Sequence, residues 1–301
     1  MSSTPGQLEH VHDNATQRGA DGAAGDFFLH HWMQILILLL ALAGLLGNGA
    51  VLWLLGFRVP RTPFSVYILN RAAADALFLC FTLLLCIREF YRYLSGGAGG
   101  SKVFFLRYIC VGLSLLAAIS TERCLSALFP VWYRCRRPKC TSAAVCAVLW
   151  TLAAVLGAIF NFCPEVVLIT YTVWFLLLTC VLCASSLTLL LRVPCCSRRR
   201  RPPRLSLLVL LSVLVFLLCG LPPGIFSFLA LRFSMHPVLY WIFSLLACIN
   251  SSVNPLIYFF VGRQRPAKRE PLRLVLQRAL REEQEMEGGM RDTLPTDSRE
   301  V

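Results

Sequence analysis

Long apolar segments alternate with short polar ones along most of the chain. Seven segments of about 20 residues or more carry almost no charge, and this is the length that a helix needs to cross about 30 Å of hydrocarbon. A backbone exposed to lipid has to satisfy its own hydrogen bonds, so each segment is predicted to be helical. The expected spans are residues 32–56, 64–87, 103–128, 141–162, 166–193, 205–231 and 238–261. The pattern therefore predicts an all-α membrane protein built as a seven-transmembrane helix bundle.

Polar segments flank this bundle, which is expected to occupy residues 32–262. Residues 1–31 contain no comparable apolar run and are expected to form an extracellular N-terminal tail. Residues 263–287 repeat apolar positions at helical spacing with arginines between them, which is typical of a helix lying on a membrane surface. We therefore expect a C-terminal amphipathic interfacial helix on the cytoplasmic side, in contact with membrane lipid. A disordered cytoplasmic tail is expected at 288–301.

Composition and charge support this organisation. The 301 residues are 57% hydrophobic and 15% charged, whereas soluble domains are about 45–50% apolar and about 25% charged. Twenty-two lysines and arginines lie in the inner segments and five in the outer ones. This asymmetry predicts an extracellular N-terminus and a cytoplasmic C-terminus. It also explains the net charge of +13, so no nucleic-acid partner is expected.

A polar cluster is expected at mid-membrane depth. Asp75 lies in the middle of the second span, where an ionised side chain costs at least about 2.5–3.5 kcal/mol. Asn48, Asn250, Ser251 and Asn254 lie at similar depth in their own spans. A carboxylate among such groups can bind a cation, here a sodium ion, or share a proton, and either state can bias helix packing. The alternative is a fixed polar cluster that only orients the helices.

Two further features are typical of a conformational switch. Glu122 and Arg123 end the third span as a pair of opposite charges, although either could instead be a residue that snorkels to the interface. Pro222 and Pro255 interrupt the sixth and seventh spans, where proline kinks a helix. Proline also occurs in membrane helices without such a role. We interpret the pair as one that can open and the prolines as hinges.

Aromatic residues near the outer ends of the spans predict a ligand pocket. Taking Arg123 and Asn254 as inward-facing, helical spacing places Gly112 and Ala247 on inward faces and turns Trp241 toward lipid. Aromatic side chains at this spacing also occur as ordinary core, which remains the alternative. The candidate pocket residues are Phe105, Tyr108, Ile109, Glu165, Tyr171, Trp174, Phe226, Tyr240 and Phe243.

Modification sites are predicted on both sides of the membrane. Asn14 begins a glycosylation sequon in the outer tail. Cys195 and Cys196 lie at an inner membrane edge beside four arginines, where palmitoylation can occur. The alternative, which has the same weight, is that both cysteines stay unmodified thiols.

Five further segments carry recognisable motifs. They are Leu113–Ser126, Trp132–Pro138, Phe216–Pro222, Asn254–Gly262 and Leu276–Leu280. Together they resemble the motifs of rhodopsin-like G-protein-coupled receptors, and more narrowly of the Mas-related receptors. The resemblance covers about residues 32–285, and no single motif would suffice.

This resemblance implies a plasma-membrane receptor rather than an enzyme, and it implies no cofactor. A small molecule or peptide outside the cell would shift the balance between two bundle conformations. The inner end of the sixth helix would move about Pro222, and Tyr258 and Asn254 would repack toward the third helix. Arg123 would leave Glu122 to meet a heterotrimeric G protein. Arrestin is a further candidate partner.

The chain departs from the receptor pattern at several positions. Gly220 stands where most rhodopsin-like receptors have tryptophan, which the resemblance to Mas-related members explains. Cys163 has no partner cysteine at a suitable position, so we expect a free or intermolecular thiol. Ile159 stands where some Mas-related receptors have an acidic residue that binds cationic peptides, and only Glu165 remains nearby as an acid. No acid lies at the inner end of the sixth span, so basal signalling is expected.

Other classes of membrane protein fit less well. A transporter would be expected to carry inverted repeats or several buried carboxylates, whereas our reading places only Asp75 at mid-membrane depth. A retinal protein would need a lysine in the seventh span, and residues 238–261 contain none. A receptor-fold protein that binds no ligand and modulates or traffics another receptor remains the alternative.

Overall fold

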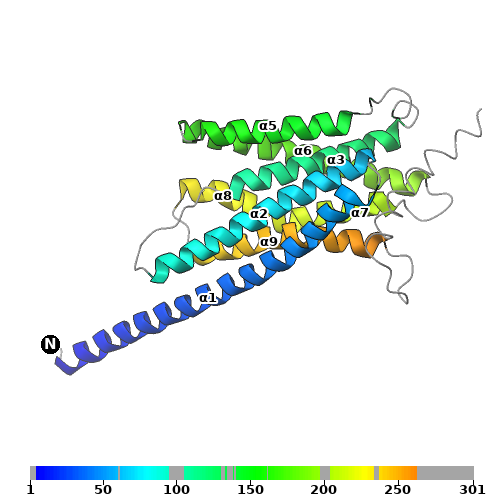
Figure 1. Cartoon of the computed structure of the whole chain (residues 1–301). Helices are drawn as coiled ribbons and strands as arrows, with labels where there is room; N and C mark the ends of the chain where they lie inside the picture. The colour runs from blue at the N-terminus through cyan, green and yellow to red at the C-terminus, as the bar shows by residue number, and fades with distance from the viewer. Residues whose placement is uncertain are drawn as a thin grey trace, which may run out of the picture.

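In the computed structural model, helices are the only regular secondary structure among the described residues. These are residues 5–59, 62–94, 105–129, 133, 138, 140–160, 162–196, 204–233 and 237–262; for 5–30 and a few helix ends only the backbone is described. The helices lie side by side as a bundle (Figure 1). They are α1 (Pro5–Phe57), α2 (Pro63–Leu94), α3 (Phe105–Leu128), α5 (Thr141–Ile159), α6 (Pro164–Cys196), α7 (Arg204–Val215), the π-helical turn η1 (Phe216–Gly220), α8 (Leu221–Arg232) and α9 (Pro237–Gly262).

Seven helical stretches are long and apolar enough to cross a membrane, which confirms the predicted fold class. They are 31–57, 63–91, 110–128, 141–159, 165–191, 206–230 and 238–261. The sixth stretch combines α7, η1 and α8. Most boundaries agree with the predicted spans within a few residues, because each depends on local hydropathy.

The first helix differs from expectation, since it begins at Pro5 rather than near residue 32. Its N-terminal part projects beyond the other helices (Figure 1). Helical backbone therefore continues into the segment that was predicted only as a polar tail. The expected interfacial helix at 263–287 and the tail at 288–301 lie outside the described residues.

The bundle has an apolar outside and a partly polar inside. Large apolar side chains such as Leu46, Leu84 and Phe162 are more than half exposed, and a surface of this kind suits contact with lipid. In the interior, by contrast, Asn48, Asp75 and Arg71 are almost completely buried. Buried polar groups need hydrogen-bond partners, so these residues define where the helices have to meet.

Close helix contacts bring this polar interior together. A Cβ atom placed on Gly44 of α1 would lie 2.2 Å from Ser252 Oγ and 2.7 Å from Leu79 Cδ1. Only glycine therefore permits this approach of α1 to α9 and α2. On the other side of α2, the Trp150 indole Nε1 of α5 donates to Asn70 Oδ1 at 3.0 Å.

Candidate functional site

The most buried charges in the described part of the chain form an ion pair on α2. Arg71 Nε lies 3.1 Å from Asp75 Oδ2, and both residues are at most 3% exposed. A spacing of four residues places them on one face of the helix. Arg71 Nη1 also donates to the carbonyl oxygen of Gly112 on α3. The pair therefore neutralises itself within α2 and joins that helix to α3.

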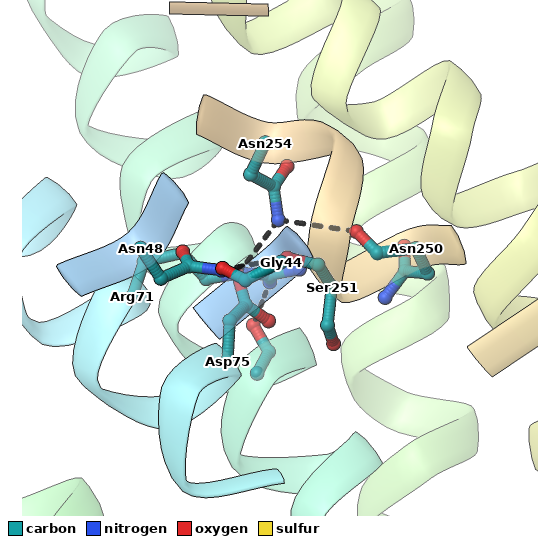
Figure 2. A network of polar contacts seen from close by, with 8 residues as sticks. Gly44, Asn48, Arg71, Asp75, Asn250, Ser251 and Asn254 are labelled. Carbon is teal, nitrogen blue, oxygen red and sulfur yellow. Dashed lines mark hydrogen bonds and ion pairs between the residues drawn. The ribbon is translucent and has the colours of Figure 1, made fainter. Parts of the chain in front are cut away.

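The seventh span supplies a second donor to the same carboxylate. Asn254 Nδ2 donates to Asp75 Oδ2 at 2.8 Å and to the Asn250 carbonyl at 3.3 Å (Figure 2). Pro255, which follows Asn254, is buried, and a Cβ on Gly47 would lie 3.2 Å from its Cβ. The buried Tyr258 lies one turn beyond Asn254. Asp75 thus holds α9 against α2 at the turn that contains Pro255.

Asn48 extends the network to α1. Its Nδ2 donates to the Ser251 carbonyl at 3.0 Å and to the Gly44 carbonyl at 2.9 Å (Figure 2). Ser252 Oγ donates to the Leu40 carbonyl at 3.2 Å. We call Asn48, Arg71, Asp75, Ser251 and Asn254 the central polar network. It links α1, α2, α3 and α9.

A small cavity with space for about one water molecule adjoins this network. The central polar network lines one side, and the π-helical turn η1 lines the other through Phe216 and Gly220. Gly112 and Ala247, which helical spacing placed on inward faces, are also at its wall. The lining residues are Arg71, Asp75, Phe78, Gly112, Leu113, Phe216, Gly220, Ala247, Asn250 and Ser251. The cavity therefore lies between the charged pair and the predicted hinge.

The hinge region has an identifiable backbone distortion. The Leu221 amide donates to the Phe216 carbonyl, which is the spacing of a π-helix. Pro222 and Pro223 follow directly; each lacks an amide hydrogen, and a proline ring clashes with the carbonyl four residues earlier. The wider turn accommodates this clash. Gly220 is needed here because a Cβ would lie 2.6 Å from Phe216 Cδ2.

The charged residues near the C-terminal end of α3 have aromatic neighbours. Glu122 accepts hydrogen bonds from Tyr67 Oη at 3.2 Å and from Tyr133 Oη at 3.3 Å. The Arg123 guanidinium lies over the Phe64 ring, 4.1 Å from its centre. The predicted pairing of Glu122 with Arg123 stays a prediction. The tyrosine contacts connect Glu122 both to α2 and to the segment that follows α3.

A serine cluster holds α3 to α6 at Ser120, two residues before Glu122. Ser120 Oγ lies 2.8 Å from Ser185 Oγ and 3.2 Å from Ser186 Oγ. All three serines are buried. Hydrogen bonds of this kind between membrane helices contribute about 0.6 kcal/mol on average, so the cluster fixes orientation more than it adds stability.

The candidate pocket residues form two aromatic pairs where they are described. Tyr171 stacks on Trp174 at 6.1 Å, and Phe226 of α8 stacks on Phe243 of α9 at 4.4 Å. Glu165 is exposed in the first turn of α6. Side chains of Phe105, Tyr108 and Ile109 lie outside the described residues.

The rotational setting of α9 was only partly predicted. Ala247 is buried, as expected. Trp241 is partly buried and packs edge-on against Tyr240 at 5.8 Å, rather than turning fully toward lipid. Trp241 lies 13 residues before Asn254, so small departures from 3.6 residues per turn add up over more than three turns and shift its direction.

Cysteines and modification sites are described only in part. Cys163 is exposed and forms no disulfide among the described residues. The side chains of Asn14, Cys195 and Cys196 lie outside that set, as do the basic residues 198–201. These modifications stay predictions.

Sequence reasoning missed Arg71, which carries the main charge contact of the site. The available signal was its spacing of four residues from Asp75 in the middle of the same span. The partners Tyr67 and Tyr133 of Glu122 were missed as well. They come from separate segments, and only the tertiary fold shows that they converge.

The presence of Arg71 bears directly on the predicted sodium ion. Asp75 Oδ2 receives two nitrogen donors, and one of them, the Arg71 guanidinium, is already a cation. The Ser251 side chain also hydrogen-bonds to the Asp75 carboxylate. Hard cations are held by oxygen ligands. The arrangement around this carboxylate oxygen therefore does not fit a sodium ion.

Comparison with known proteins agrees with this arrangement of helices. Residues 47–166 match the family model described as "7 transmembrane receptor (rhodopsin family)". The chain is similar to Mas-related G-protein coupled receptor member X2 of Hoolock hoolock, with 47% identity over 84% of each chain. The Homo sapiens and Macaca mulatta proteins of that name are 45% and 46% identical, over 88% and 84% of each chain. With identity at this level over most of its length, the chain belongs to the Mas-related G-protein coupled receptors.

Proposed function

We propose that this receptor converts the binding of an extracellular small molecule or peptide into nucleotide exchange on a heterotrimeric G protein. The observation that carries the proposal is the central polar network. It joins four helices and adjoins a cavity beside the π-helical turn. A bundle whose helices are connected through one buried ionic group can change arrangement as a unit, which is what transmembrane signalling requires.

The proposed ligand site lies at the end of the bundle where α6 and α9 begin. Its candidate side chains include the stacked pairs Tyr171–Trp174 and Phe226–Phe243. The second pair connects α8 to α9, and α8 leads directly into η1. A ligand that moves Phe226 would therefore act on the helix that contains Pro222.

The proposed signalling end is the opposite one, at Glu122 and Arg123. We infer that Arg123 leaves the Phe64 ring and meets the G protein when the sixth span moves outward. Glu122 and its tyrosine contacts would hold the inner segment after α3 in place. This proposal requires the N-terminus outside and the C-terminus inside a plasma membrane. Arrestin would be expected to use the same end.

The direct test is nucleotide exchange by purified receptor in lipid nanodiscs with representative G proteins of each class. We expect ligand-free exchange above that of empty nanodiscs, because the sequence lacks an acid at the inner end of the sixth span. Arg123→Ala should reduce that rate to background. Matching rates for wild type and Arg123→Ala would contradict basal signalling.

A ligand screen in cells then tests the ligand-dependent step, with calcium and cyclic nucleotide as readouts. A response that Arg123→Ala abolishes would support the proposal. Persistent absence of any response and of basal exchange would instead favour a receptor-fold protein that modulates another receptor.

A further inference from the structure

We propose that the Arg71 guanidinium is the resident cation of the small cavity beside the central polar network. The conformation of this receptor is therefore insensitive to sodium. Arg71 occupies the place beside Asp75 where the sequence predicts a sodium ion. The binding part of this inference is independent of the proposed function. Only its consequence for signalling rests on that function.

The contacts of Arg71 account for its position. Its Nε meets Asp75 Oδ2, its Nη1 donates to the Gly112 carbonyl, and the residue is 2% exposed. A Cβ built on Gly112 would lie 3.6 Å from Arg71 Cζ, which is an ordinary van der Waals contact, so the guanidinium packs directly against this position. A longer side chain at residue 112 would fill the space of the guanidinium. The bundle thus carries both the cation and the gap that receives it.

A second cation in this cavity would be repelled. At about 4 Å from the guanidinium and an effective dielectric constant of about 20, repulsion lowers the affinity of a monovalent cation by a factor of roughly 1,000. The carboxylate that would attract the ion is already neutralised by Arg71. A sodium ion is therefore repelled by Arg71 and is no longer attracted by a free Asp75 charge.

The Arg71 guanidinium differs from a bound sodium ion because it cannot exchange with solvent. A dissociable ion links the conformation of its site to the concentration of that ion. A cation that belongs to α2 cannot dissociate, so the link is removed. Rearrangement of the cavity then requires Arg71 to change partners rather than an ion to leave.

The test compares melting temperatures of purified receptor in sodium chloride and in choline chloride at equal ionic strength. Wild type should melt at the same temperature in both salts. Arg71→Leu should melt about 2 °C higher in sodium, at a sodium concentration ten times its dissociation constant. Adding Asp75→Asn to Arg71→Leu should abolish that difference. Arg88→Leu, which removes a partly exposed arginine of the same helix, should behave as wild type.

Two results would overturn the proposal. One is a sodium-specific rise in the melting temperature of wild type, and the other is an Arg71→Leu protein that stays insensitive to sodium. If Arg71→Leu does not fold, Arg71→Gln removes the charge but keeps a donor for Gly112, and the same two salts are compared. Because no G protein is used, a receptor that never promotes nucleotide exchange would sink the proposed function while leaving this result intact.

Discussion

At the scale of single residues, Arg71 and Asp75 depend on each other. Both are buried, and the carboxylate receives a guanidinium and an amide donor at once. Removing one member of such a pair leaves an uncompensated charge, which costs about 3–5 kcal/mol, whereas replacing both by apolar groups is often neutral. The pair is therefore a constraint on the helices rather than a large net source of stability.

We predict that Asp75→Leu destabilises the bundle by about 3–5 kcal/mol, because it leaves the buried Arg71 charge without its counter-ion. Asp75→Leu combined with Arg71→Leu should recover most of the loss. Thermal unfolding in detergent measures both variants. A double variant no more stable than the single one would show that the charges are not coupled.

Some residues of the candidate site were predictable from the sequence, and others were not. The sequence predicts Asp75, Asn254 and Asn48 at similar depth from their positions along the helices, and in the structure Asn254 bonds to Asp75 and Asn48 to Ser251. The partner Arg71 was overlooked, because a mid-membrane charge was interpreted as one isolated group. The Tyr67 and Tyr133 contacts of Glu122 depend on tertiary geometry that spacing does not provide.

At the scale of helices, small residues decide how closely neighbours approach. Gly44 of α1 faces Ser252 of α9 with no room for a methyl group, whereas a Cβ on Gly49 of the same helix would meet nothing within 4 Å. The seven spans themselves were predictable, because hydropathy is a local property. Their distances were not, because each depends on two facing side chains.

We predict that Gly44→Ala destabilises the receptor by about 1–3 kcal/mol, because α1 must move away from α9. Gly49→Ala is the matched control and should be neutral or slightly stabilising, since alanine is the better helix former. Melting temperatures of the two variants in the same detergent test this. Equal values would show that α1 adjusts without cost.

The π-helical turn gives a second prediction for an element. Gly220→Ala should destabilise the sixth span by about 1–3 kcal/mol, because its Cβ would meet the fully buried Phe216 ring. Adding Phe216→Leu should restore part of the loss by making room. A double-mutant cycle on thermal unfolding measures the coupling, and additive effects would argue against a direct contact.

At the scale of the whole molecule, the bundle is predicted to have one orientation. Inner segments carry most of the lysines and arginines, so the N-terminus should be outside. An epitope tag at the N-terminus should bind antibody on intact cells, and one at the C-terminus only after permeabilisation. The reverse pattern would remove the basis for placing Arg123 on the G-protein side.

The whole bundle is unevenly covered by its own side chains. Within the most apolar 18 residues of each helix, 56% of the residues are buried inside the bundle in α3 and in α9. The share is 22% in α5 and in α6. Surrounding lipid therefore packs against much of α5 and α6 and acts there as a structural component. A detergent micelle that replaces the bilayer has to cover these two helices. The acyl-chain length of the detergent should therefore affect the stability of α5 and α6 before it affects the helices around Asp75.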